Sequence, residues 1–168
     1  MNYSQFIGQV QNRARMATQA KAVRATRATL QTLGQRLGGG EPSDIAAQLP
    51  NEIGRYLKIS GAQEGVRFGL DEFFHRVRAH MGDGTDLPDA VFYARVVMSV
   101  LKEAISPGEW RDMKAQFPDE YDALLEAGYA GEMEEAHDDE SDAGNTLQMG
   151  DTATESEWTK TGPAGDRN

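Results

Sequence analysis

Apolar side chains recur every three or four residues along residues 1–130, a spacing that is typical of helices burying one face. The two longest stripes are Val23, Thr26, Leu30, Leu33 and Leu37, and Val91, Ala94, Met98, Leu101 and Ile105. Two shorter stripes precede them, formed by Phe6, Val10, Ala14 and Ala17, and by Leu70, Phe73, Phe74, Val77 and Met81. No alternating run is long enough for a sheet, and only residues 66–68 could be extended. The pattern therefore predicts an all-α fold.

Capping residues and prolines mark the ends of the predicted helices. Ser106 and Glu109 have the spacing of a capping box, with a proline at the first helical position. Asp86 precedes the second long helix and is expected to cap it. Pro50 and Pro118 each end one short helix and can open the next, because proline is accepted in a first turn.

The helical pattern occurs twice. Residues 40–57 align with residues 108–125 at an offset of 68, and eight of the 18 positions are identical. The same offset aligns residues 20–37 with residues 88–105. Each copy therefore has a long, a long, a short and a short helix.

This repeat divides the chain into a first copy (1–60), a linker (61–69), a second copy (70–130) and a C-terminal segment (131–168). A copy of about 55 residues buries little hydrophobic core on its own. We therefore expect the two four-helix copies to pack face to face as one domain about a pseudo-two-fold axis.

Short motifs give the repeat a signature. Ala-Gln-Leu-Pro at 47–50 and Ala-Gln-Phe-Pro at 115–118 each follow a Gly-Glu pair, and Leu-Asp-Glu-Phe opens the second copy at 70–73. With these motifs the chain resembles, over roughly residues 2–126, the prokaryotic family catalogued as domain of unknown function 2267. The resemblance implies a duplicated all-helical fold in a soluble bacterial or archaeal protein, and it supplies no catalytic residue. The three glycines at 38–40 and the acidic C-terminal segment depart from the family pattern.

Charge is distributed unevenly along the chain. The full sequence carries a net charge of −10, from 27 acidic and 17 basic residues. Residues 131–168 hold 11 acidic and two basic residues, whereas residues 1–60 have a net charge of +5 and residues 61–130 one of −6. The last segment has too few large apolar side chains to offset about 1–2 kcal/mol of backbone entropy per ordered residue. We therefore expect it to be a disordered acidic tail.

Composition excludes several classes of protein and site. The chain has no cysteine, so disulfides and thiolate chemistry are excluded and the cytoplasm is the expected location. No run of about 18 apolar residues is present, so no membrane span is expected. No Ser-His-Asp arrangement is visible, and the glycines at 38–40 fit a helix stop better than a phosphate cradle. His75 and His80 lie about 140° apart around a helix and cannot share a metal. Because none of these arrangements is visible, we expect no enzyme activity, cofactor or metal site.

The polar residues that recur in both copies are the candidate site residues: Arg27 and Arg95, Glu41 and Glu109, Asp44 and Asp112, Gln48 and Gln116, and Glu52 and Glu120. Arg27 lies at the border of its apolar stripe, where a guanidinium can reach a carboxylate on the following short helices. Glu41 and Asp44 fall in a first helical turn, where the helix dipole favours negative charge. We interpret these pairs as structural ion pairs and caps, with a duplicated ligand site as the alternative.

Basic residues of the first copy suggest two kinds of partner. Arg13, Arg15, Lys21, Arg24 and Arg36 could form one basic face. Our first hypothesis is a non-enzymatic helical module that binds a protein partner, with the acidic tail as a tether or recognition segment. The alternative is a nucleic-acid-associated protein whose basic face is screened by that tail.

Overall fold

Side chains that accept hydrogen bonds from backbone amides begin three of the four long helices. In the computed structural model, which describes residues 1–61 and 64–126, Asn2, Thr18 and Asp86 each accept from the backbone N–H three residues later. The prediction for Asp86 is thereby confirmed. The four helices are α1 (Tyr3–Arg13), α2 (Gln19–Arg36), α5 (Leu70–Met81) and α6 (Leu87–Ala104).

Short helices follow each long pair. They are α3 (Glu41–Ala46), α4 (Asn51–Gly54) and the 3₁₀ helix η1 (Arg55–Lys58) after α2, and α7 (Pro107–Lys114), the 3₁₀ helix η2 (Asp119–Tyr121) and α8 (Asp122–Leu125) after α6. Pro50 and Pro118 stand directly before α4 and η2, as the sequence predicts. The described residues contain helices and no strand, which confirms the all-α prediction. Within those residues no helix is both long and apolar enough to cross a membrane.

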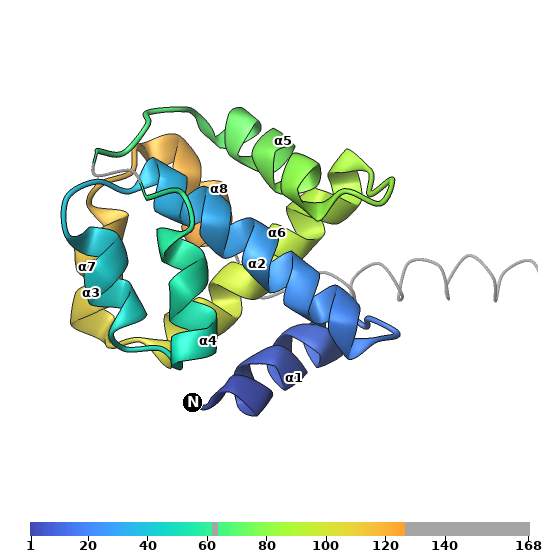
Figure 1. The fold of residues 1–168 in the computed structure, drawn as a ribbon. Coiled ribbons are helices and arrows are strands. Elements are labelled where there is room, and N and C mark those ends of the chain that lie inside the picture. Colours follow the sequence, from blue (N-terminus) through green and yellow to red (C-terminus); the bar gives the residue numbers. More distant parts are fainter. Residues whose placement is uncertain (62–63, 127–168) are drawn as a thin grey trace, which may run out of the picture. The chain divides into compact units, whose positions relative to one another are not determined.

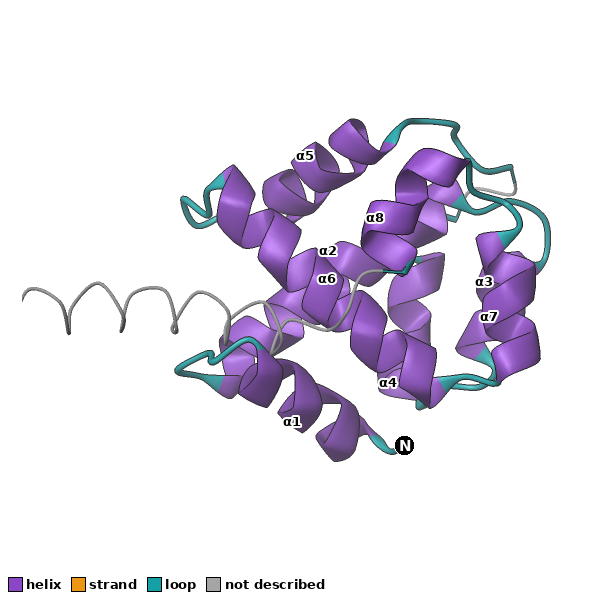
Figure 2. Cartoon of the chain, turned by 180° about the vertical axis from the view of Figure 1, so that it is seen from behind, coloured by secondary structure: helices purple, strands orange, loops and turns teal. Residues whose placement is uncertain are grey.

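Helices α2 and α6 lie at the centre and cross each other, with α1 on one side of the crossing and α5 on the other (Figure 1). Helices α3 and α7 pack together at one end, and α8 packs against α6 (Figure 2). All of these elements belong to one unit, Met1–Ala130. The acidic tail predicted at 131–168 lies outside the described residues.

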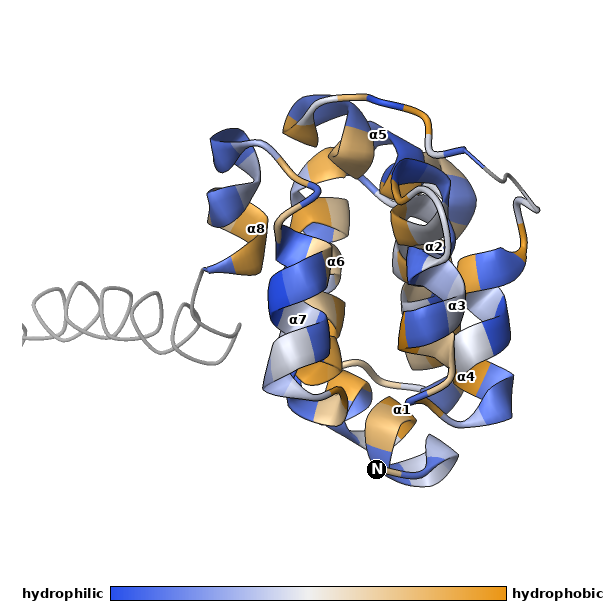
Figure 3. Ribbon diagram, turned by 90° about the vertical axis from the view of Figure 1, so that its left-hand side faces the viewer, coloured by the Kyte–Doolittle hydropathy of each residue, from blue (hydrophilic) through white to orange (hydrophobic). Residues whose placement is uncertain are grey.

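The predicted apolar stripes supply more than half of the largest fully buried side chains. The largest fully buried side chains are those of Phe6, Ile7, Leu30, Leu33, Leu37, Ile45, Ile53, Leu57, Phe73, Met98, Leu101 and Tyr121. Helix α2 buries more than one stripe because α1, α5, α6 and η1 all pack against it. Ala17 does not belong to the core, since it is exposed and lies beyond the end of α1. Figure 3 shows hydrophobic residues of α8 turned toward α6, with hydrophilic residues on the outer surface of α3 and α7.

One close approach in this core requires a glycine. A Cβ atom on Gly34 of α2 would lie 2.0 Å from the carbonyl oxygen of Leu57 and 2.8 Å from its carbonyl carbon. The missing side chain therefore lets the backbone of α2 touch that of η1. Gly8 of α1 is the opposite case, because it is exposed and no atom lies within 4 Å of a Cβ built there.

The last residue of α2 is a buried arginine. Arg36 is only 6% exposed, and its Nε donates to the carbonyl oxygen of Phe68 at 2.9 Å. The hydroxyl of Tyr121 donates to the same oxygen at 2.8 Å. The guanidinium carbon lies 5.1 Å and 5.4 Å from the ring centres of Phe117 and Tyr121. Arg36 thus joins α2 to the segment before α5 and to η2, and it cannot contribute to an exposed basic face.

Candidate functional site

Gln48 joins the first half of the chain to the start of α7. Its side-chain oxygen accepts a hydrogen bond from the backbone nitrogen of Ser106 at 2.7 Å, and its amide donates to Glu109 Oε1 at 3.4 Å. Ser106 Oγ accepts from the backbone nitrogen of Glu109, which is one half of the predicted capping box. The other half is wrong, because Gln48 and not Glu109 binds the Ser106 amide. A residue from the other half of the chain therefore completes this cap.

Gln116, just after α7, makes the corresponding contacts in the opposite direction. Its side-chain oxygen accepts from the backbone nitrogen of Gly38 at 3.3 Å, and its amide donates to Glu41 Oε1 at 3.3 Å. The two glutamines, and the groups that they bind, are each related by the 68-residue offset of the repeat. In both directions the contact therefore uses the same polar groups, which are the oxygen and the amide of a glutamine side chain, a backbone amide and a glutamate carboxylate.

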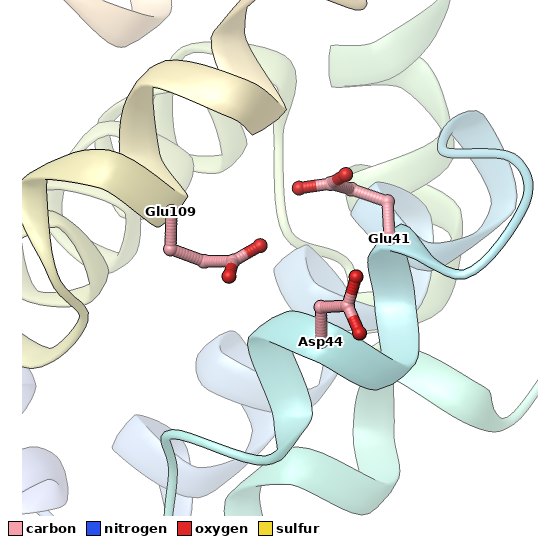
Figure 4. Close-up of side chains that lie close together, drawn as sticks. All are labelled: Glu41, Asp44 and Glu109. Carbon is pink, nitrogen blue, oxygen red and sulfur yellow. The ribbon is translucent and has the colours of Figure 1, made fainter.

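The α3–α7 interface, by which we mean residues 38–48 and 106–116, also brings carboxylates together. Glu41 and Asp44 of α3 and Glu109 of α7 point into the space between the helices, and their oxygen atoms come within 4.8 Å of one another (Figure 4). Burial, a hydrogen bond with Glu109 and the negative charges nearby raise the pKa of Glu41 to about 7. The sequence predicted a structural role for these acids, but it could not place them opposite one another.

This carboxylate cluster can hold a proton or a cation. When Glu41 is protonated, it shares its proton with Glu109, and the two carboxyl groups stay together without repulsion. When both are ionised, they and Asp44 form the all-oxygen ligand set that divalent cations take. The sequence predicted no metal site, and among the described residues these three are the group that could hold an ion. Asp112, which aligns with Asp44, is exposed on α7 and adds to the negative charge.

Replacing Glu41 with glutamine is expected to stabilise the protein above neutral pH. Between the unfolded pKa of 4.5 and the folded pKa of about 7, the folded chain keeps a proton that the unfolded chain releases. The contribution of Glu41 to stability is therefore fully present below this window and is lost as the pH rises through it. At a pH above the window, Glu41→Gln should gain about 1–2 kcal/mol in the free energy of unfolding, after allowance for screening by water.

Urea unfolding across this pH range, in buffer that contains a chelator, measures the effect. Glu52→Gln is the matched control, because Glu52 is exposed on α4 and lies outside the α3–α7 interface. The interpretation is wrong if the wild-type and Glu41→Gln stabilities run parallel from pH 4.5 to 7.

The two repeated arginines have different surroundings. Arg95 of α6 donates from Nη2 to the carbonyl oxygen of Ala123 in α8 at 2.7 Å. Arg27 of α2 is exposed and forms no ion pair with a described residue, so the expected contact with a carboxylate on the short helices is not made. Recurrence in the sequence therefore does not give these two arginines the same role.

The basic residues predicted to share one face are dispersed by their contacts. Arg13 of α1 pairs with Glu103 of α6 at 2.9 Å. The ammonium of Lys21 lies 5.3 Å from the ring centre of Tyr93, which is also on α6. Together with the buried Arg36, these side chains hold helices to one another, so the predicted face is not continuous.

Two members of that set remain at the surface. Arg24 pairs with Asp83 in the α5–α6 loop at 2.7 Å, and its side chain is 42% exposed. Arg15 is exposed just after α1, with a left-handed backbone. Of the five, Arg24 alone lines a cavity whose wall also includes Arg27 and Arg55.

This cavity has a volume of about 480 Å³ and lies between α2 and η1. Its lining consists of Val23, Arg24, Arg27, Arg55, Tyr56 and Ile59, and we call it the arginine pocket. The guanidinium of Arg55 lies over the ring of Tyr56, 5.7 Å from its centre. Ile59 is 42% exposed at the edge of the same pocket. Three cationic groups therefore surround an apolar floor.

The three residues that η1 and its C-terminal end contribute to this pocket were not among the predicted site residues. A usable signal was present in the repeat, because Arg24 aligns with Phe92 and Arg55 aligns with Ala123. Residues that the shared scaffold needs are expected in both copies, whereas a site on one copy needs residues that occur once. Positions at which the two copies differ were therefore more informative about this pocket than positions at which they are identical.

Comparison with protein families gives one match. The family described as uncharacterized conserved protein (DUF2267) matches residues 3–124. This range contains both sequence copies, the α3–α7 interface and the arginine pocket, and it ends before the acidic segment at 131–168. No curated protein matches the chain.

Proposed function

Because the chain belongs to this family of uncharacterized conserved proteins, and because one face carries the arginine pocket, we propose that it is a non-enzymatic helical module that binds a protein partner. The observation that carries the proposal is the exposed Ile59 beside three arginines and Tyr56. Arginine and tyrosine are enriched at protein interfaces and often dominate their binding energy. The arginine pocket is accordingly the partner-binding surface.

The contacts of the recurring polar residues support a structural role for them. Gln48 and Gln116 bind backbone amides and carboxylates across the α3–α7 interface, and Arg95 binds a backbone carbonyl. Each of these contacts joins two helices. The cytoplasm remains the proposed location, and residues 131–168 remain a proposed tether or recognition segment.

We also infer that the domain arose by duplication and that its halves are related by a pseudo-two-fold axis. Two longer helices followed by short ones occur both before residue 60 and after residue 70, and α2 and α6 both have 18 residues. The reciprocal contacts of Gln48 and Gln116 are the kind that a two-fold axis produces, in which one patch meets a second version of itself.

The nucleic-acid alternative has less support from the contacts. A nucleic-acid surface needs several cations along one track to neutralise successive phosphates. Arg13, Lys21 and Arg36 are instead paired with an acid, stacked on a ring and buried, respectively. The basic residues that remain at the arginine pocket surround an apolar floor, which suits a protein side chain better than a phosphate.

A photo-crosslinking amino acid at position 59 is expected to capture a reproducible protein partner from native lysate, because Ile59 is exposed at the arginine pocket. The same amino acid at position 79 is the control, since Ala79 is exposed on α5 and does not line that pocket. Mass spectrometry of the crosslinked bands identifies the partner. The proposal fails if position 59 captures nothing reproducible, or only the proteins that position 79 also captures.

A further inference from the structure

The arginine pocket carries more positive charge than the described residues around it balance. Arg24 pairs with Asp83 through Nη2, while its Nε is buried without a hydrogen-bond partner in the described part of the chain. Neither Arg27 nor Arg55 forms an ion pair with a described residue. A guanidinium offers a planar set of donors that matches a carboxylate in a bidentate pair. The pocket is therefore suited to a ligand that brings carboxylates.

The floor of the pocket adds a second requirement. Val23 is half-buried and Tyr56 is only 7% exposed, so both present fixed apolar surface. Ile59 is 42% exposed beside them. A ligand that covers these side chains removes apolar surface from water, which a purely ionic ligand does not do. The ligand must therefore carry an apolar group as well as negative charge.

The fold itself does not require the arginines at positions 24 and 55. Arg24 and Arg55 align with Phe92 and Ala123, where the second copy forms the corresponding helices α6 and α8 without an arginine at either position. The two arginines are thus extra to the scaffold, and both line the same cavity.

We propose that the arginine pocket binds an acidic peptide segment of a partner protein, in which one aromatic or branched aliphatic side chain lies between carboxylates. The apolar side chain packs against Tyr56 and Ile59. Carboxylates on either side of it bind the guanidinium groups of Arg27 and Arg55. This inference rests on the proposed function, because it names the chemistry of the partner at the same surface.

A peptide fits the pocket better than the other anionic macromolecules do. A nucleic acid presents phosphates at regular intervals and needs a long basic track, whereas this surface offers three arginines around one cavity. Acidic peptides place carboxylates and an apolar side chain within a few residues of each other. The cavity volume of about 480 Å³ lies in the range of pockets that take such compact groups.

Fluorescence anisotropy with the full-length protein and a labelled peptide, Ser-Glu-Glu-Phe-Glu-Glu-Ser, tests the proposal. We expect saturable binding that weakens by about 10-fold or more in Arg55→Ala, because one bidentate pair is lost. Arg55 is exposed, and alanine is the residue at the aligned position, so the variant is expected to fold. Arg111→Ala is the matched control, since Arg111 is an exposed arginine of α7 that does not line the pocket.

Three further measurements decide what kind of ligand is bound. Replacing the peptide's phenylalanine with serine should weaken binding by about 10-fold, and raising salt from about 50 to about 200 mM should also weaken it. The proposal is overturned if Arg55→Ala and Arg111→Ala lose the same affinity for the peptide. It is also overturned if the serine peptide binds as tightly as the phenylalanine peptide. Displacement of the peptide by oligothymidine at a lower concentration than by unlabelled peptide overturns it in favour of a nucleic acid.

The chain's own acidic segment is the remaining competitor. If the peptide binds about 10-fold more tightly after the 11 acidic residues of 131–168 are replaced by amides, that segment and not a partner is the occupant. An unchanged affinity supports a partner peptide. A crosslinked partner at position 59 without peptide binding overturns this inference and leaves the proposed function standing. Peptide binding without a crosslinked partner supports the ligand chemistry of the pocket and counts against the proposed function.

Discussion

Replacing Gly34 with alanine is expected to lower the free energy of unfolding by about 3 kcal/mol, because the added methyl group meets backbone atoms that cannot move aside. The new Cβ would lie 2.0 Å from the carbonyl oxygen of Leu57, so α2 and η1 have to separate. Separation would open the core around Leu57, which is fully buried. Urea unfolding followed by far-ultraviolet circular dichroism measures the loss.

Gly8 supplies the matched control for this substitution. It lies on the exposed face of α1, and a Cβ there meets nothing within 4 Å. Gly8→Ala should therefore raise stability by about 0.5–1 kcal/mol, since alanine loses less backbone entropy in a helix. Effects of the same sign at both positions would contradict the close approach of α2 and η1.

Replacing Arg36 with alanine is expected to lower the free energy of unfolding by about 2–4 kcal/mol. The substitution removes the hydrogen bond from Nε to the Phe68 carbonyl and the side chain that lies against Phe117 and Tyr121. It leaves a cavity at the junction of α2 and η2, because Arg36 is 6% exposed. Thermal and urea unfolding give the loss.

Two further variants identify its cause. Arg36→Lys keeps the charge but not the planar group that spans the rings, so it should recover only part of the stability. Arg78→Ala removes an exposed arginine of α5 and should change stability by less than about 0.5 kcal/mol. If lysine restored the full stability, charge rather than ring stacking and the hydrogen bond would be what Arg36 supplies.

Helices and their starts were predictable because local signals determine them. Asp86 caps α6, and Pro50 and Pro118 stand before short helices, as a few neighbouring residues indicate. The capping box at Ser106 was only half right, since Gln48 takes the place of the expected local partner. A contact between residues 58 positions apart is invisible to a rule about residues three positions apart.

Burial of charged residues was the main feature that sequence reasoning missed. Arg36 falls in the last turn of a helix, where a basic residue usually faces water and is stabilised by the helix dipole. Its environment is made by Phe68, Phe117 and Tyr121, which come from distant parts of the chain. Only the folded arrangement brings these rings together, so spacing within α2 could not predict the burial.

The candidate sites show the same limit. Recurrence singled out Glu41 and Glu109 as candidates, but the contact between their carboxyl groups depends on how α3 faces α7. The arginine pocket depends on the approach of η1 to α2, which brings Arg55 beside Arg27. Neither arrangement follows from a helical period, because each is set by packing between elements.

Either half of the domain, expressed alone, would carry a glutamine without its target and a backbone amide without its acceptor. The amide of Ser106 needs Gln48, and the amide of Gly38 needs Gln116. Two separate copies could meet these needs only by associating, and their folding would then depend on concentration. Joining them through residues 61–69 replaces that encounter with an intramolecular one, so the domain keeps its stability on dilution.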